Sequence, residues 1–298
     1  MNKKSNTFLI MKKNRSLIYL ALLPTFALLA IFNYCPVYSA LKHAFYQWDP
    51  GGVHRFIGVA NFVRLAQDGI FWKSLHNLLI IILINSTVKI AIPLVVAVLI
   101  FHLAAEKIRY LYRVLFVIPM VVPTMVTILI WSYIYSDTGI LSELLRAVGL
   151  DRYDRAWLGS PQTALASVVG VGFPFVSGLA LLVFYAGLMN LPESIFDAAT
   201  IEGATQWQLF SKIELPLLLR QVRVILVLTV LGSVQGYELF LILTRGGPGY
   251  ETMVPGLWMY LTGFSFNEMG YACCIGFVMF LFMLLITITN LKFIQPRD

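Results

Sequence analysis

Long apolar runs separated by short polar segments dominate the pattern along this chain of 298 residues. Six runs stand out, at roughly 17–40, 77–101, 112–135, 164–188, 221–243 and 270–292. Each is near or above the ~20 residues that a helix needs to span ~30 Å of hydrocarbon at ~1.5 Å per residue. Backbone groups in lipid must bond within their own segment, and a transmembrane β-strand needs only ~10 alternating residues. The pattern therefore predicts an all-α, polytopic membrane protein with six transmembrane helices.

The composition fits a chain that lies mostly in lipid. Hydrophobic residues make up 59% of it and charged residues only 12%, with a mean hydropathy of +0.79. A soluble domain usually carries about a quarter charged residues. No polar stretch is long enough for a separate soluble domain, so we expect one transmembrane domain over residues 17–295, after a tail at 1–16. The first run is too long for a signal peptide, which favours an uncleaved spanning helix.

Lysine and arginine are unevenly divided between the two sides of the membrane that six spans define. An even number of spans places both termini on one side, where 13 basic residues fall against 8 on the other. The positive-inside rule therefore predicts that both termini and the connection at 189–220 are cytoplasmic. The net charge of +7 reflects this topology, and no basic patch with interleaved aromatic residues indicates nucleic-acid binding.

The long inner connection, 189–220, predicts two short helices that meet at a glycine. Asn190, with Glu193 three residues on, is typical of a helix N-terminus. Gly203 is expected to end this first helix. Thr205 and Gln208 form a second capping pair, so a new helix should start near Thr205.

The surface of this connection suggests contact with another protein. The second helix carries Trp207, Phe210 and Ile213 at helical spacing, and Pro216 is expected to end that register. The first helix carries small residues after Asp197, which would let another protein approach closely. We interpret the connection as a docking surface, and a solvated connector without a partner is the alternative.

Motifs for nucleotide binding, hydrolysis and metal binding are absent from the sequence. There is no G-x-x-x-x-G-K-[ST], H-E-x-x-H, C-x-x-C or G-x-S-x-G. The four histidines share no helical face, and the three cysteines fall in or near spans, where small apolar side chains pack. We therefore expect a non-catalytic membrane protein without a metal site or a cofactor of its own.

One constellation in the inner connection has fixed positions at long spacing. Its members are Asp197, Ala198, Ala199, Gly203, Ile213, Leu215 and Pro216. The spacing resembles the cytoplasmic loop signature of permease subunits of ATP-binding-cassette (ABC) importers. In that family the signature reads Glu-Ala-Ala, three residues, Gly, nine residues, Ile, one residue, Leu-Pro. The one departure is Asp197 in place of the usual glutamate, a shorter side chain with the same charge.

The resemblance extends over about residues 17–295 and indicates the carbohydrate-uptake branch of that family. The further segments that carry it are Phe71 to Asn77, Tyr112-Arg113, Pro119 and Pro123, Trp157-Leu158, and Leu243 to Pro248. Together they resemble permeases of the maltose and glycerol-phosphate type.

The resemblance implies a type I importer permease fold in a bacterial cell membrane and a defined set of partners. The loop helix near 191–204 would dock in a groove of a cytoplasmic ATPase, of which two copies would bind ATP and Mg²⁺. A second, homologous permease subunit would complete the translocation path as a heterodimer. An extracytoplasmic solute-binding protein would deliver a sugar or oligosaccharide.

Two groups of residues are candidates for the substrate path. Thr229, Ser233 and Gly236 recur at i, i+4 and i+7, which makes one small or polar stripe on the fifth span. The resemblance matches this stripe and a second group around Pro174 to positions that line the sugar site, and Tyr237 and Glu238, next to the stripe, are further candidates. That second group consists of Val171, Gly172 and Phe175. Helix–helix packing explains both groups equally well, because small residues favour close approach in membranes.

Glu238 and Lys89 are the charged residues that lie deepest in apolar runs. Each would cost ~2.5–3.5 kcal/mol at a helix centre facing lipid, so both should face the protein interior or water. We hypothesise that Glu238 faces the mouth of a cavity, and an interfacial position is the alternative. Their opposite signs allow an ion pair between them.

An ion-coupled secondary transporter is the alternative from another functional class. It would be expected to carry intramembrane relays of acidic residues and histidines, where this sequence offers only Glu238 and Lys89. The outer loops hold 8 basic and 8 acidic residues and do not favour an anionic substrate. Co-purification with an ATPase and a second permease would separate the two classes.

Overall fold

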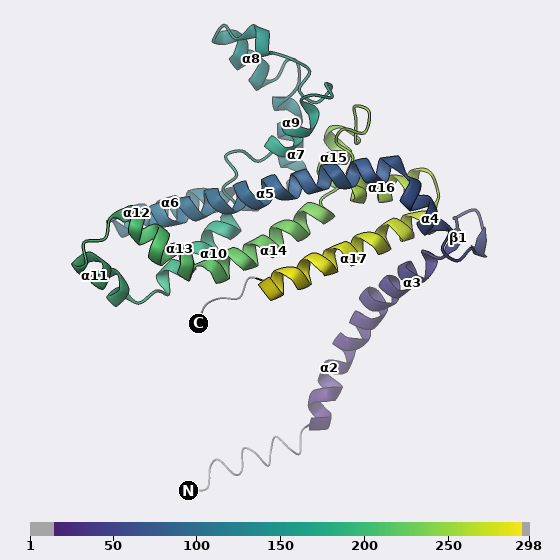
Figure 1. Ribbon diagram of the computed structural model, residues 1–298, viewed down its shortest axis with the longest axis horizontal. Coiled ribbons are helices and arrows are strands. Elements are labelled where there is room, and N and C mark those ends of the chain that lie inside the picture. The colour runs from purple at the N-terminus through teal and green to yellow at the C-terminus, as the bar shows by residue number, and fades with distance from the viewer. Residues whose placement is uncertain (1–14, 294–298) are drawn as a thin grey trace. The chain divides into compact units, whose positions relative to one another are not determined.

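The computed structural model describes residues 15–293, and nearly all of its regular structure is helical (Figure 1). The predicted tail at 1–16 lies almost entirely outside the described residues. Contacts divide the chain into two units, Met1–Ala66 with Thr262–Val278 and Gln67–Leu261 with Met279–Asp298. Each unit is described by itself below.

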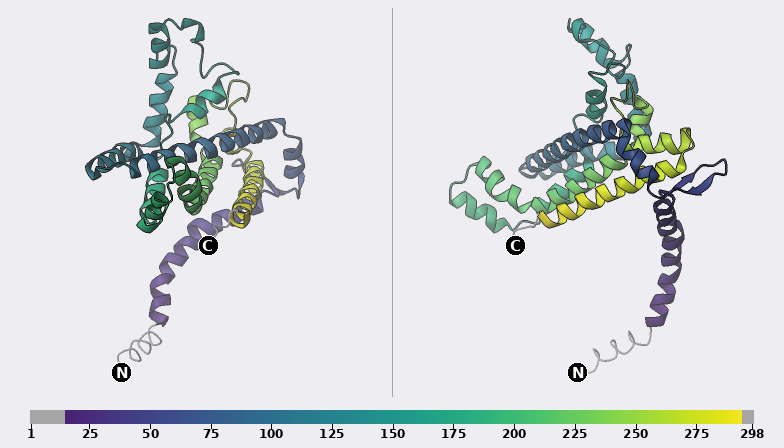
Figure 2. Two further views of the ribbon diagram at one scale, coloured as in Figure 1. Left: turned by 60° about the vertical axis from the view of Figure 1, so that its left-hand side comes forward. Right: turned by 45° about the vertical axis from the view of Figure 1, so that its right-hand side comes forward.

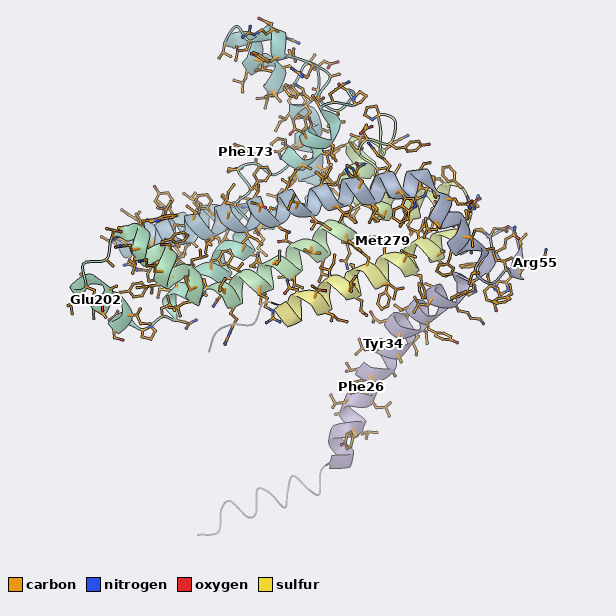
Figure 3. The ribbon with its side chains drawn as sticks, viewed as in Figure 1. Phe26, Tyr34, Arg55, Phe173, Glu202 and Met279 are labelled. Atoms are coloured by element: carbon orange, nitrogen blue, oxygen red, sulfur yellow. The ribbon has the colours of Figure 1, made fainter. Side chains whose placement is uncertain are left out.

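The first unit contains the first apolar run and a short hairpin. The run forms one long helix from α2 (Arg15–Leu29), the π-helical turn η1 (Ala30–Tyr34) and α3 (Cys35–His43). Figure 3 labels Phe26 and Tyr34 on it, and both rings are exposed, as expected for a lipid-facing helix. The strands β1 (Tyr46–Trp48) and β2 (His54–Phe56) pair antiparallel around a turn at 49–52. The unit also holds most of α4 (Ala60–Gln67), η5 (Leu261–Ser265) and the start of α17 (Met269–Phe293).

The second unit is built around α5 (Gly69–Phe101), a helix of 33 residues. The helices α10 (Gly178–Met189) and α14 (Leu219–Gln235) pack along it (Figure 2). Leu94, Leu181 and Phe184 lie in their common apolar core. Gly187 permits the close approach, because a Cβ there would lie 2.6 Å from Leu218 Cδ2.

The remaining elements of this unit connect those helices. They are α6 (Glu106–Val117), η2 (Ile118–Val121), α7 (Thr124–Ile134), α8 (Ile140–Ala147), η3 (Asp151–Tyr153), α9 (Ala164–Gly170), α11 (Glu193–Ile201), α12 (Gln206–Leu209), η4 (Phe210–Glu214), α13 (Leu215–Leu217), α15 (Glu238–Leu243) and α16 (Pro255–Tyr260).

Three helices in the described residues are long and apolar enough to cross a membrane unbroken: Tyr19–His43, Gly69–Phe101 and Met269–Asn290. Three further helix pairs pass the same test but bend by 91°, 71° and 65°, which gives up to six spans if each pair counts as one. The all-α prediction holds. The expectation that each apolar run is one continuous helix is wrong for the third, fourth and fifth runs.

Proline and glycine account for the breaks in those three runs. The third run breaks at Pro123, which has no N–H to donate to the helix ladder. The fourth breaks between α9 and α10, around Gly172 with a φ of 93° and Pro174 after a cis peptide bond. Figure 3 labels Phe173 in this segment. The fifth breaks at Gly236, between α14 and α15.

The inner connection forms two short helices as predicted, with two corrections. Asn190 is not the N-cap of α11: it is the C-cap of α10, and its side-chain amide donates to Ala186 O at 2.8 Å. Pro216 does not end the second helix, because it sits in the first turn of α13, where its missing N–H is tolerated. The bend comes after it, at Leu218.

Two other predictions for this connection are confirmed. Gly203 follows α11 with a φ of 71°, a left-handed conformation that glycine adopts without strain. Thr205 and Gln208 form a capping box at the start of α12. Local side-chain chemistry thus sets the boundaries of both helices.

Candidate functional site

A cavity of about 510 Å³ lies in the second unit. Five elements contribute to it: α5, α7, the segment from α9 to α10, α14 and α15. Its polar or small lining residues are Asn85, Lys89, Thr124, Thr127, Gly172, Ser177, Thr229, Gly232, Ser233, Gly236 and Glu238. Its apolar lining includes Ile81, Ile128, Val168, Val171, Ile225 and Phe240.

All three breaks in the apolar runs border this cavity. Thr124 follows the break at Pro123, Gly172 and Ser177 flank the second break, and Gly236 marks the third. Non-helical backbone at membrane depth is tolerated only where protein buries it or where it lines a water-filled space. The breaks therefore identify the cavity as the polar interior of the spanning region.

A hydrogen bond between side chains joins two walls of the cavity. Asn85 on α5 donates through Nδ2 to Ser233 Oγ on α14 at 3.0 Å. Ser177 caps the start of α10 by accepting from Ala180 N at 3.4 Å. Thr124, Thr127 and Thr229 also line the space. Such a surface can exchange hydrogen bonds with a polar solute.

The structure brings most of the predicted substrate-path residues together. Val171, Gly172, Thr229, Ser233, Gly236 and Glu238 all line the cavity. Phe175 and Tyr237 are not among its described lining residues. The Phe175 ring packs edge-to-face on Phe173, with centroids 5.8 Å apart. Tyr237 stacks on Tyr260, with centroids 5.2 Å apart.

Sequence reasoning missed the contribution of two other spans to this cavity. Asn85 and Lys89 lie one turn apart on α5, and Thr124 and Thr127 lie on α7. The i, i+4 spacing of Asn85 and Lys89 could have indicated a polar face on an otherwise apolar helix. The conceivable Lys89–Glu238 ion pair is not formed among the described side chains, although both residues line the cavity.

The inner connection, residues 189–220, is called the coupling segment below. Its surface away from α5 is largely exposed. Asp197, Ala198 and Gly203 are exposed, whereas Ala199 turns inward and is buried. Figure 3 labels Glu202 at the end of α11. Two large apolar side chains stand free, since Ile201 is 87% and Trp207 72% exposed. Exposed apolar side chains grouped on short helices are typical of a docking surface.

The inward side of the coupling segment is held by the Phe101 end of α5. His102 Nε2 lies 2.6 Å from Glu214 Oε1, and the Glu214 side chain is only 1% exposed. Its second oxygen, Oε2, has no hydrogen-bond partner among the described residues. The Phe101 and Phe196 rings lie 5.7 Å apart and tie α11 to the same end.

The remaining residues of the motif lie where the coupling segment meets the core. Leu215 packs against the apolar core of α5, α10 and α14. Ile213 is half-buried and Pro216 is exposed. The motif therefore spans both faces of the coupling segment: an open face around Ala198 and an inner face around Leu215.

The Gly69 end of α5 holds a different loop, residues 244–258. Asn77 is 1% exposed, and its Nδ2 donates to three carbonyl oxygens, those of Tyr250, Glu251 and Met253, at 3.3, 3.0 and 2.9 Å. Lys73 Nζ lies 2.7 Å from Glu251 Oε2. Asp68, which caps α5 through Oδ1, accepts from Trp258 Nε1 through Oδ2 at 2.9 Å.

Spans broken around a polar cavity are expected of a membrane transport subunit. Residues 103–296 match the family described as "Binding-protein-dependent transport system inner membrane component", which is well over half of the chain. The chain belongs to this family. It is therefore an inner-membrane permease of an ABC importer, a non-catalytic subunit, and the ion-coupled alternative is not supported.

Curated relatives match over nearly their whole length. The "Probable ABC transporter permease protein YurN" of Bacillus subtilis is 30% identical over 96% of this chain and 98% of its own. The "Sulfoquinovosyl glycerol transport system permease protein SmoG" of Agrobacterium fabrum is 27% identical, over 96% of this chain and 92% of its own. The "Lactose transport system permease protein LacF" of Rhizobium radiobacter is 26% identical, over 94% of each chain.

A solved structure confirms the fold. A chain of the bacterial alginate ABC transporter, solved in complex with an alginate pentasaccharide-bound periplasmic protein, superposes with a TM-score of 0.83. The match covers 94% of each chain at 24% sequence identity. The predicted importer permease fold is thus confirmed.

Proposed function

We propose that this permease moves a carbohydrate into the cytoplasm through the cavity described above. The observation that carries the proposal is that polar residues from five elements, five of them with hydroxyl groups, meet where the spans break. A volume of about 510 Å³ falls within the ~300–1,000 Å³ typical of small-molecule sites. Three relatives are named as permeases for sulfoquinovosyl glycerol, for lactose and, in the 27% identical AmyD of Thermoanaerobacterium thermosulfurigenes, for starch degradation products, which supports the carbohydrate class.

The energy for this movement would come from outside the chain. We infer that the open face of the coupling segment, with Ala198, Ile201 and Trp207, docks on a cytoplasmic ATPase. Two ATPase copies would hold ATP and Mg²⁺, and a second permease would close the other side of the path. A solute-binding protein would deliver the substrate from outside, as the family description implies. Both termini would then be cytoplasmic, in keeping with the distribution of basic residues.

The fold offers a mechanical route from the coupling segment to the cavity. The segment runs through η4 and α13 into α14, with a 65° bend at Leu218 and no longer loop between them. The 17 residues of α14 extend roughly 25 Å at 1.5 Å per residue. Ser233 and Gly236, at its far end, line the cavity. A push on the coupling segment would therefore tilt one wall of the substrate path.

Reconstitution of the full transporter tests this function. The chain is assembled with its second permease and ATPase in liposomes, the binding protein is added outside, and uptake of labelled di- and trisaccharides is followed. We expect uptake that requires ATP on the side of the membrane where the ATPase lies, which is the liposome interior in this arrangement. Uptake should stop in a Gly203→Asp variant. Uptake driven by an ion gradient without ATP would overturn the proposal, as would normal uptake by the variant at normal expression.

A further inference from the structure

Lys89 is a cation without a described counter-charge inside the spanning region. It lies 20 residues into α5, far from either end of that helix, and it lines the cavity. Among the described side chains, no carboxylate lies within ion-pair distance of its ammonium group. An ionised side chain at this depth is costly unless water, a partner or a ligand solvates it, so its presence is a feature that requires an explanation.

The other charge in the cavity sits at a different level. The Asn85–Ser233 hydrogen bond provides a reference, because it joins α5 to α14 directly. The two helices run in opposite directions, since the C-terminal end of α5 meets Glu214, just before α14. Lys89 follows Asn85 toward that end, whereas Glu238 follows Ser233 toward the opposite end. At 1.5 Å per residue, Lys89 lies roughly 6 Å beyond Asn85 along α5, whereas Glu238 lies past the break at Gly236 on the other side of Ser233.

The cavity is therefore bipolar, with an ammonium donor at one level and a carboxylate acceptor at the other. The Asn85–Ser233 pair lies between them in sequence register, and Thr229, four residues before Ser233 on the antiparallel α14, lies at the Lys89 level. An ammonium group has three donors and no acceptor, and it bonds an anionic oxygen about twice as strongly as a neutral one. A carboxylate only accepts hydrogen bonds, and it suits hydroxyl groups while it repels an anion.

We propose that Lys89 binds an acidic group of the transported carbohydrate, a carboxylate or a sulfonate, and selects acidic sugars over neutral sugars of the same size. The proposal rests on the carbohydrate function proposed above. Glu238 accepts hydrogen bonds from hydroxyl groups at the other end of the substrate. Its negative charge repels the acidic group, which therefore stays at the Lys89 level. The selectivity resides in the cavity, because the outer loops carry equal numbers of acidic and basic residues.

The test uses the reconstituted transporter with size-matched pairs of sugars as probes. Neutral di- and trisaccharides of galactose, glucose and mannose are compared with the corresponding uronic acid oligomers. In the wild type we expect ATP-dependent uptake of at least one acidic probe. Lys89→Gln should lower kcat/KM for that probe by about tenfold or more, and by less than about twofold for its neutral counterpart. Lys89→Arg, which keeps the charge, should retain most of the uptake of the acidic probe.

Controls separate a binding role from a structural one. Lys107→Gln removes an exposed lysine of α6 and should leave both probes unaffected. Complex assembly and basal ATP hydrolysis are measured for each variant. Equal losses for both probes would overturn the proposal and indicate packing or a pair with a carboxylate of the second permease. Uptake of neutral probes alone would overturn it while leaving the proposed function intact, and a complex that moves no carbohydrate at all would overturn both.

Discussion

The two ends of α5 each hold a loop, and they do so in different ways. At the Gly69 end, Asn77 satisfies three backbone carbonyls of the loop at 244–258, and Asp68 and Lys73 add further contacts. At the Phe101 end, the coupling segment is held by one polar side-chain contact, His102 to Glu214, by ring contacts with Phe196 and by the packing of Leu215 on the apolar core. One oxygen of Glu214 remains without a described partner.

The difference indicates which end is built to move. Several buried, mutually satisfied hydrogen bonds fix one geometry, because breaking any of them exposes the others to an apolar surrounding. A single polar side-chain contact with one unused acceptor can be remade in a second geometry at lower cost. We therefore interpret the Gly69 end as a fixed anchor and the Phe101 end as the movable one, where the ATPase would act.

The largest effect should follow from breaking the fixed end. Asn77→Leu removes the buried donor shared by three loop carbonyls, and we expect a loss of about 3 kcal/mol in unfolding free energy. Thermal unfolding in detergent measures it. His76→Leu, at the exposed neighbouring position, is the control and should change little. Equal stability of the two variants would show that the amide does not anchor the loop.

The movable end should respond with a smaller loss of stability and a larger loss of coupling. His102→Leu leaves the buried Glu214 carboxylate uncompensated, which should cost about 2 kcal/mol. Glu214→Gln keeps an acceptor for His102 and should cost less. Sugar molecules moved per ATP hydrolysed should fall in His102→Leu while ATP hydrolysis continues. An unchanged ratio would contradict the assignment of this end as the transmitting one.

The middle of α5 provides an intermediate case. Ser233→Ala removes the acceptor of the Asn85 amide, and interhelical hydrogen bonds in membranes contribute about 0.6 kcal/mol on average. Ser86→Ala is a matched control, because the Ser86 hydroxyl is buried and has no partner among the described residues. We expect unfolding to shift slightly for the first variant and not for the second. A larger shift for Ser86→Ala would contradict the described hydrogen bonding.

The segment around α8, residues 140–154, lies away from both ends of α5, and substitutions in it should have the smallest effect. The Ser142 hydroxyl and then the Arg146 guanidinium lower the pKa of Asp154 below its ordinary value of 3.8. Because the pKa of Asp154 is lower in the folded state, its carboxylate contributes fully to stability above pH 3.8. That contribution is lost as the pH falls through the folded-state pKa. Hydrogen exchange of this segment should therefore be constant from about pH 7 to 5, and Asp154→Asn should remove any change below about pH 4.

Features set by neighbouring residues could be predicted from the sequence, and features set by distant ones could not. Gly203 and the Thr205–Gln208 box were predicted because caps depend on residues three positions apart. Asn190 was misassigned because its sequence position suits both the C-terminus of α10 and the N-terminus of α11. The hydrogen bond from its side chain to Ala186 O shows that it caps α10. His102 and Glu214 meet across 112 positions, a pairing that no local pattern indicates.

The cavity shows the same division. Thr229, Ser233 and Gly236 were found as one stripe on one helix, which periodicity detects. Lys89 was noticed as a deep charge, but its place in the cavity depends on which face of α5 meets α14. The broken spans were predicted as continuous because hydropathy measures polarity and not backbone geometry. Phe175 was misplaced for that reason, since its φ of 63° lies within a break.

Gly203 has a stereochemical consequence. A Cβ built on it would meet nothing within 4 Å, so the position does not require a small residue for lack of room. What it requires is a φ of 71°, which is unfavourable for an L-residue by about 1–2 kcal/mol. Mirror-image alanine, introduced by semisynthesis, should therefore restore the turn where ordinary alanine strains it. This position therefore requires a handedness and not a small size.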